Sequence, residues 1–186
     1  MSFPKALPVL LVASILVAAC GYTMTARSDE PGRTTVAVPE FDNRTFEPYV
    51  ETRVTTRVKS RLVSSGPWRV VNDPQRAALV IHGAITGFGV TTVAFDANNQ
   101  PLEQRVFITA DITTESKSAA PLRVMVTGTA EYTQDSDSLQ TRAAKNRAIE
   151  EAGDNLAETL IARLELHLMS QEHAATPEAA GEPSAP

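Results

Sequence analysis

The chain has 186 residues and a formal net charge of −5, and hydrophobic residues make up 42% of it. That hydrophobic share is enough for the core of one domain but too small for a bundle of membrane-spanning helices. The chain has no excess of basic residues, so its charge gives no indication of a nucleic-acid partner.

The first twenty residues are typical of an exported bacterial lipoprotein. Lys5 precedes an apolar run from Leu7 to Ala19, which is too short to span a bilayer because a spanning helix needs about 20 residues. The run ends in Val17-Ala18-Ala19-Cys20, which resembles the lipobox, where a protease cleaves before a cysteine that carries lipid. Cys20 is the only cysteine and has no disulfide partner within the chain. We therefore expect residues 1–19 to be a signal peptide and Cys20 to be lipidated. The alternative is a plain secreted protein that begins with cysteine.

Residues 20–33 are expected to form a lipidated tether. They are rich in polar residues with little apolar spacing, so they cannot bury an apolar face and should be extended or mobile. Residue 21 is glycine, whereas aspartate at that position tends to retain a lipoprotein in the inner membrane of bacteria with the usual sorting. We therefore expect the protein on the periplasmic side of the outer membrane, attached to the membrane by its N-terminal lipid.

A strand and a helix are predicted next. Thr34 to Val38 favour a strand, and Pro39 ends it because proline cannot donate a hydrogen bond to a neighbouring strand. An apolar residue then recurs every four positions, at Val50, Val54, Val58 and Leu62. This spacing predicts a helix with one apolar stripe, which would run roughly from Pro48 to Ser65.

Four later stretches have the composition of strands, namely Trp68–Val71, Ala77–Phe95, Val106–Thr113 and Leu122–Tyr132. The stretch from Ala77 to Phe95 contains three glycines, so we expect either one long strand or two strands bent at a glycine. Loops are expected at Phe95–Pro101 and at Ser116–Pro121.

The last predicted element is a long helix from about Ser138 to Leu168, in which alanine and leucine residues lie four apart. The composition of residues 169–186 predicts a disordered tail. Residues 34–168 are therefore expected to form a single α/β domain of the α+β class. The expected architecture is a two-layer sandwich, with two helices packed on one face of a mixed, mostly antiparallel sheet of four to five strands. The other sheet face would be polar, and either solvated or covered by a partner.

The sequence offers no set of residues that indicates catalysis. His82, His167 and His173 do not have the spacing of metal ligands, and the one cysteine is the expected lipid site. A nucleophile also needs a base and an orienting group within reach, and no such set is recognisable. We therefore expect a protein that is not an enzyme and that has no metal and no cofactor.

The order of the motifs resembles the lipopolysaccharide-assembly lipoprotein family, LptE. The resemblance rests on Cys20-Gly21-Tyr22, the segment Val36–Pro48, the helix with Glu51, the hairpin Phe95–Thr114 and the long C-terminal helix. It covers nearly all of residues 20–168. It implies an outer-membrane lipoprotein that sits inside the lumen of an LptD-type β-barrel, helps that barrel to assemble and supports insertion of lipopolysaccharide into the outer leaflet. Lipopolysaccharide is a possible second partner.

Lipopolysaccharide carries phosphates, so cationic side chains near an exposed sheet edge are candidate contacts. Arg105, Lys117 and Arg123 lie on or beside the two central predicted strands and are the candidates. Their alternative role is that of ordinary solvated charges at strand ends. No cationic site of the family maps clearly onto this sequence.

A second interpretation is a lipoprotein that activates a cell-wall (peptidoglycan) synthase. Such activators also combine a lipid anchor, a tether and an α/β domain, and Phe41-Asp42-Asn43 after the first strand is similar to them. They usually need a much longer tether to cross the peptidoglycan. Here the segment from Cys20 to Thr34 extends at most roughly 45 Å, which favours a domain close to the membrane. An enzyme is a third class, for which the sequence offers no catalytic residues.

Overall fold

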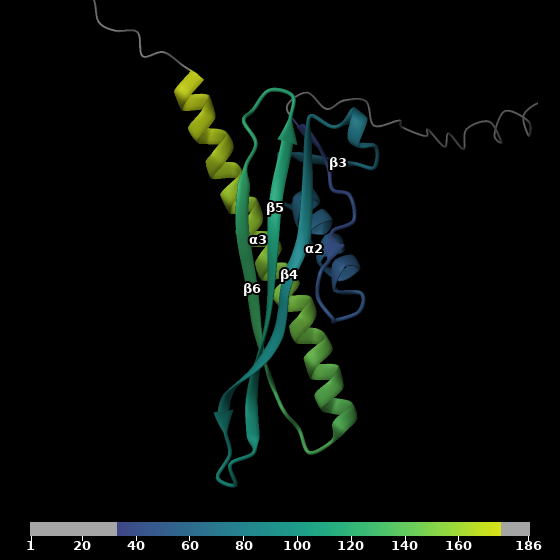
Figure 1. The fold of residues 1–186 in the computed structure, drawn as a ribbon, viewed down its shortest axis with the longest axis vertical. Helices are drawn as coiled ribbons and strands as arrows, with labels where there is room; N and C mark the ends of the chain where they lie inside the picture. Colours follow the sequence, from purple (N-terminus) through teal and green to yellow (C-terminus); the bar gives the residue numbers. More distant parts are fainter. Residues whose placement is uncertain (1–32, 176–186) are drawn as a thin grey trace, which may run out of the picture. The chain divides into compact units, whose positions relative to one another are not determined.

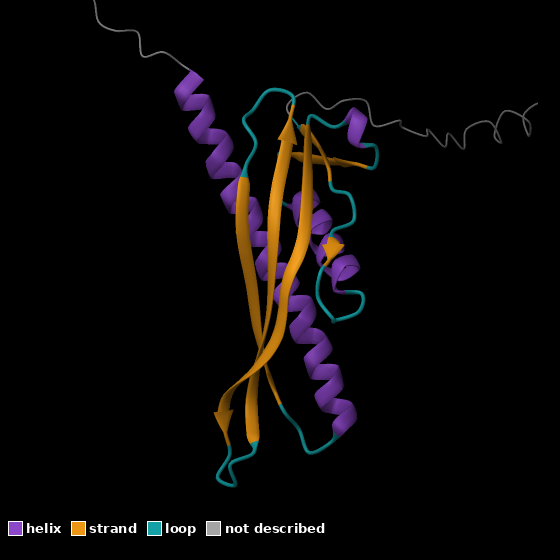
Figure 2. Cartoon of the chain, in the orientation of Figure 1, coloured by secondary structure: helices purple, strands orange, loops and turns teal. Residues whose placement is uncertain are grey.

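The computed structural model describes residues 33–175. Two helices, α2 (Val50–Ser64) and α3 (Ser138–Ala175), cover one face of a six-stranded sheet, as Figure 1 and Figure 2 show. The predicted signal peptide, most of the predicted tether with Cys20, and residues 176–186 lie outside the described residues. This two-layer arrangement of helices on a mixed sheet confirms the predicted α+β fold.

The sheet has the strand order β3-β1-β4-β5-β6, and β2 pairs with β4 outside this path. The strands are β1 (Thr34–Ala37), β2 (Asp42–Asn43), β3 (Trp68–Val71), β4 (Leu79–Phe95), β5 (Pro101–Ser116) and β6 (Arg123–Thr133), with a 3₁₀ turn η1 (Pro74–Arg76) before β4. Pairing is parallel between β1 and β3, β1 and β4, and β2 and β4, and antiparallel along β4, β5 and β6. The sheet has more strands than the predicted four to five, because the sequence did not indicate β2. This strand has two residues, too few to produce an alternating pattern.

The core lies between the helices and the inner face of the sheet. The predicted stripe of α2, which includes Val54 and Val58, is fully buried. Helix α3 contributes alanine and leucine residues four apart, and Ile81, Ile108 and Ile112 fill the sheet side. Each of these elements therefore buries the apolar face that its periodicity predicted.

Ion pairs join the two helices on the solvent side of the core. The Arg57 guanidinium donates to Glu150 at 2.7 and 2.9 Å and lies 3.4 Å from Asp154. The hydrogen bond to Glu150 raises the pKa of Arg57. The side chains of these pairs are 30–37% exposed, so each pair contributes at most about 1 kcal/mol. The packing of the two helices is therefore set by the core.

Helix α2 begins later than predicted. It starts at Val50 rather than at Pro48, because Tyr49 adopts a left-handed conformation with φ 62° and ψ 10°. A residue in that conformation cannot belong to a right-handed helix.

Helix α3 ends later than predicted and includes residues 169–175, which were expected to belong to the tail. Its apolar stripe ends near Leu168, so the apolar periodicity of the sequence could not predict the last turns of the helix. There the Gln171 side chain accepts a hydrogen bond from the Ala120 backbone N–H at 2.8 Å and so attaches the helix to a distant loop. A contact between residues this far apart in sequence is invisible to periodicity.

Strand β4 is one continuous strand rather than two, with a register shift between Ile85 and Gly87. The rings of Phe41 and Phe107 lie against Gly83 and Gly89, since a Cβ atom at either glycine would come within 2.6 Å of them. The aromatic rings cover the space that the missing side chains leave, so the glycines do not interrupt the strand.

The hairpin that joins β4 to β5 extends beyond α2 at one end of the sheet (Figure 1). Near its tip Val93, Phe95 and Leu102 are exposed. The Asp96 carboxylate accepts hydrogen bonds from the backbone N–H groups of Asn98 and Gln100, both at 2.8 Å, and so orders the turn. Among residues 33–175, no helix has the length and apolarity needed to cross a membrane.

Candidate functional site

The two helices leave the outer face of strands β4 to β6 open, as the alternating burial along β5 and β6 shows. Threonine side chains recur along it, and the hydroxyls of Thr109 and Thr127 lie 3.0 Å apart on neighbouring strands. Met125 is the main apolar side chain of β6 on this face and is 68% exposed. Nothing in the described part of the chain covers the face, so it is available to water or to a partner.

Arg105 points outward from β5 on this open face. Its Nε donates a hydrogen bond to Glu131 Oε1 at 2.8 Å, and its Nη2 contacts the same oxygen. The two residues are directly opposite each other on β5 and β6, so the pair follows from the strand register. The charge of Arg105 is therefore already balanced within the chain.

Lys117 and Arg123 lie at the other end of β5 and β6. Lys117 follows the end of β5, and its Nζ donates to the Gln75 carbonyl at 3.1 Å. Arg123 begins β6 opposite Thr113 and is exposed. Because Arg105 and Thr113 are both on β5, Arg105 and Arg123 are about 27 Å apart along the sheet, at about 3.4 Å per residue. The structure thus does not bring the three predicted cations together, and their binding of phosphate stays a prediction.

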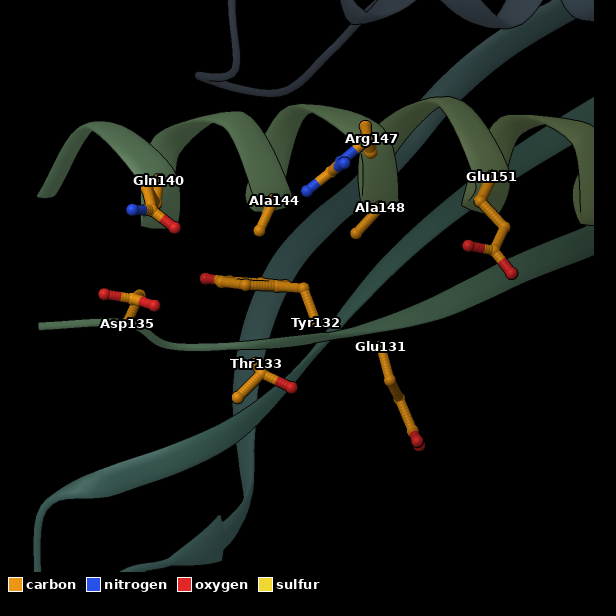
Figure 3. Close-up of a pocket in the computed structure, with 9 residues that line it drawn as sticks. All are labelled: Glu131, Tyr132, Thr133, Asp135, Gln140, Ala144, Arg147, Ala148 and Glu151. Atoms are coloured by element: carbon orange, nitrogen blue, oxygen red, sulfur yellow. The ribbon is translucent and has the colours of Figure 1, made fainter. Parts of the chain in front are cut away.

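A pocket of about 430 Å³ opens between the end of β6 and the first turns of α3 (Figure 3). It is lined by Glu131, Tyr132, Thr133, Asp135, Gln140, Ala144, Arg147, Ala148 and Glu151. Figure 3 shows the Tyr132 ring beneath the small side chains of Ala144 and Ala148. These two alanines leave the space that the ring needs, and no sequence pattern indicated a pocket here because its two sides come from different elements.

The chemistry of this pocket does not suit a phosphate. Arg147 is the one basic residue among the nine that line it, and the carboxylates of Asp135 and Glu151 outnumber it, whereas Glu131 is paired with Arg105 on the other face of β6. The Tyr132 hydroxyl donates to the Gln104 side chain, and burial raises the pKa of Tyr132. The tyrosine therefore stays neutral at physiological pH, and the pocket is net acidic.

A second, more apolar cavity of about 570 Å³ lies at the end of the domain where β1 begins. Thr34, Trp68 and Leu79 form one side of it, and Leu168 and Met169 of α3 form the other. The Trp68 Nε1–H group is buried and has no hydrogen-bond partner among the described residues. This cavity was not predicted, because its walls also come from segments far apart in the sequence.

The histidines lie apart from one another. His82 projects from β4 with its Nε2 3.8 Å from Glu115, and the His167 ring contacts the Ala120 carbonyl at 3.1 Å. His173 is in the last turn of α3. Within residues 33–175, no group of three or more histidine, cysteine, aspartate or glutamate side chains could hold a metal ion. Cys20, the predicted lipid site, lies outside the described residues.

Comparisons with known proteins identify the family. The model of the LptE family, described as lipopolysaccharide-assembly, matches residues 33–164. No curated protein matches the sequence. Among solved structures, rare lipoprotein B from Shewanella oneidensis is similar, with 11% identity and a TM-score of 0.54 over 75% of this chain and 99% of that chain. The hypothetical protein CT253 from Chlamydia trachomatis has 12% identity and a TM-score of 0.50 over 74% of this chain and 99% of that chain.

At such low identity these structures show a shared fold, whereas the family match covers well over half of the chain and also confirms the resemblance of the motifs. The chain therefore belongs to the LptE family of outer-membrane lipoproteins that function in lipopolysaccharide assembly.

Proposed function

We propose that the domain acts as a plug and assembly aid inside an LptD-type outer-membrane β-barrel, and so supports insertion of lipopolysaccharide into the outer leaflet. The observation that carries this proposal is the open, threonine-rich face of β4 to β6. The lumen of a wide barrel is polar and filled with water, so a protein inside it needs polar contacts rather than a large apolar interface. Family membership supports the same role.

Several polar groups of this face are already paired within the chain. Arg105 and Glu131 already form a pair within the chain, and the hydroxyls of Thr109 and Thr127 already lie within hydrogen-bond distance of each other. Groups that are satisfied in the free protein lose little when a partner excludes water from them. Such a surface favours many weak contacts spread over a large area, as a plug requires.

Two loops extend these contacts toward the ends of the domain. Residues 96–101 form the tip of the β4–β5 hairpin, and residues 116–121 join β5 to β6 at the opposite end. Asn98 is exposed at the first loop, and Ala119 is half-buried at the second. A barrel that surrounds the domain would contact both loops.

Photo-crosslinking in intact cells tests the proposal. A photoreactive amino acid at Asn98 or at Ala119 is expected to capture the barrel, and depletion of the protein is expected to lower the amount of correctly folded barrel. Depleted cells should also become permeable to large hydrophobic compounds. If these positions and a scan of the other exposed loops capture only cell-wall synthases or nothing, the plug proposal fails. Capture of a synthase would instead support the activator interpretation.

We further propose that Cys20 is acylated and anchors the domain on the periplasmic side of the outer membrane. One acyl chain binds a membrane only marginally, since each buried methylene contributes about 0.8 kcal/mol, so several chains are needed for a stable anchor. Intact mass measurement of protein extracted from membranes should show loss of residues 1–19 and an added lipid mass. A mature protein without added mass would contradict this.

For lipopolysaccharide, Arg123 is the best placed of the three predicted cations. Arg105 is paired with Glu131, and Lys117 donates to the Gln75 carbonyl, whereas Arg123 forms no ion pair with the described residues. An unpaired guanidinium can donate two parallel hydrogen bonds to a phosphate without first giving up a partner. We expect Arg123→Glu to weaken binding of lipopolysaccharide by the purified protein more than Arg105→Glu does. Equal binding by the two variants would argue against Arg123.

A further inference from the structure

Two aromatic side chains are exposed on the loop between β2 and α2. Phe46 is fully exposed, and Tyr49 is 71% exposed. The loop, residues 44–49, overlaps the segment Val36–Pro48 that carries the family resemblance, and the function proposed above assigns it no role. Exposed aromatic residues on a mobile loop would not indicate a binding site. They indicate one only if the domain holds the loop in one conformation.

Asn43 fixes the loop with every polar group of its side-chain amide. Its Nδ2 donates to the Glu47 carbonyl at 2.8 Å and to the Glu51 carboxylate at 2.7 Å. Its Oδ1 accepts from the Thr45 backbone N–H at 2.9 Å and from the Thr45 hydroxyl at 2.8 Å. An asparagine amide has two N–H donors and one carbonyl acceptor, and all of them are used here.

Further contacts attach both ends of the loop to the domain. On one side the Phe41 backbone N–H donates to the buried Thr55 hydroxyl of α2 at 3.0 Å, and the Phe41 ring lies on Gly83 of β4. On the other side Glu47 lies 3.7 Å from Lys145 of α3. The loop is thus attached to the sheet and to both helices, and it presents Phe46 in a defined position.

Two features of Tyr49 are unfavourable for the stability of the domain. Its φ of 62° is a left-handed conformation that is unusual for a bulky residue, and the residue is largely exposed. Tyr49 is also the N-cap of α2, where serine, threonine, aspartate or asparagine would bond the first turn, and it makes no such bond. A glycine or asparagine would stabilise the chain better at this position.

We propose that residues 44–49 dock onto the barrel partner, with Phe46 and Tyr49 as aromatic anchors and Arg44 beside them. This inference rests on the proposed function for the identity of the partner. The complementary surface would offer an apolar pocket for the Phe46 ring and a carboxylate for Arg44, which is exposed and forms no ion pair with the described residues. Aromatic residues and arginine contribute most of the affinity at many protein interfaces, and rigid anchors bind with a smaller entropic cost.

The surroundings of the loop favour a protein partner over a lipid surface. The carboxylates of Glu40 and Asp42 are exposed nearby, and they would be repelled by anionic lipid headgroups. A flat bilayer also does not require the fixed geometry that Asn43 provides. A protein pocket does require it, because a displaced ring would not enter.

The experiment compares exposed side chains in the full-length lipoprotein, purified with its partners from solubilised envelopes. We expect Phe46→Ala to lower recovery of the barrel at least tenfold without changing the melting temperature, because the ring touches nothing in the chain. Phe46→Tyr should restore recovery, since it keeps the ring. Leu166→Ala is the matched control, because Leu166 is a large exposed side chain of α3, on neither the open sheet face nor the docking loop.

Tyr49→Gly separates docking from a structural role. Glycine relieves the left-handed strain, so we expect the melting temperature to rise while recovery of the barrel falls. A structural role would instead require both quantities to fall together, and that result would overturn the proposal.

Photoreactive residues at positions 46 and 98 make the two proposals distinguishable. Capture of the barrel at position 46 supports the docking loop. Capture at position 98 but not at 46, with full recovery of the barrel by Phe46→Ala, overturns the docking loop and leaves the plug intact. Capture of the barrel at neither position overturns the docking loop, as do lipid adducts alone at position 46. The plug fails as well only if position 119 and the other exposed loops also do not capture the barrel.

Discussion

Gly128 of β6 sets the distance between α3 and the sheet. A Cβ atom at this position would lie 2.0 Å from the Ala152 carbonyl oxygen and 2.5 Å from the Leu156 backbone nitrogen. Both are backbone atoms of α3, so no side-chain rotation can make room and the helix itself must move. Overpacking of a core costs about 1–3 kcal/mol, and the backbone clash places this site at the upper limit. We therefore expect Gly128→Ala to lower the free energy of unfolding by about 3 kcal/mol.

The same substitution at Gly153 of α3 should have the opposite sign. A Cβ atom there would lie 3.5 Å from Arg57 Cγ and 3.9 Å from Val54 Cγ2, which are ordinary contacts. Alanine is favoured over glycine inside a helix by about 1 kcal/mol. We therefore expect Gly153→Ala to raise the free energy of unfolding by about 1 kcal/mol.

Thermal and urea unfolding of the two variants measures this difference. Both are made in the Cys20→Ser background and followed by circular dichroism. For a domain of this size 1 kcal/mol corresponds to about 3 °C, so the melting temperature should fall by about 9 °C for Gly128→Ala and rise by about 3 °C for Gly153→Ala. If Gly128→Ala unfolds at the temperature of the parent, α3 does not approach β6 this closely and the packing argued here is wrong.

Two further predictions concern the core and the pocket. Val58→Asp would bury an unpaired charge and should lower the free energy of unfolding by several kcal/mol. Val63→Asp, on the exposed side of α2, should be nearly neutral. Equal melting temperatures of the two variants would contradict the orientation of the helix. Burial raises the pKa of Tyr132 above the value of about 10 in the unfolded chain. The folded state therefore favours the neutral phenol, and its contribution is complete below pH of about 10 and is lost as the pH rises through the folded pKa. Tyr132→Phe should reduce this alkaline loss of stability, as measured by urea unfolding at increasing pH.

The sequence by itself determined the class of fold and the buried face of each main element. Val50, Val54, Val58 and Leu62 recur at the helical period, and all four are buried. Val106, Ile108, Ala110 and Ile112 alternate along β5, and they face the core. Such periodicities follow from local backbone geometry, so they can be read without knowing what the element packs against.

Only the tertiary structure determined where each helix or strand ends and which strands pair with each other. Strand β2 exists because Asp42 and Asn43 pair with Ala84 and Ile85, and two residues carry no pattern of their own. Strand β4 remains continuous past its glycines because rings from elsewhere in the chain cover them. Helix α3 continues past its apolar stripe where Gln171 bonds the backbone of Ala120.

The candidate surfaces depend on tertiary structure in the same way. The sequence identified Arg105 as a cation but could not show that Glu131 faces it, because that pairing is set by the register of β5 and β6. It also marked the segment around Asn43 without showing that the amide holds Phe46 out in solvent. A periodic pattern records the surroundings of one element, whereas a contact between distant residues depends on how the elements pack, and only the folded chain determines that.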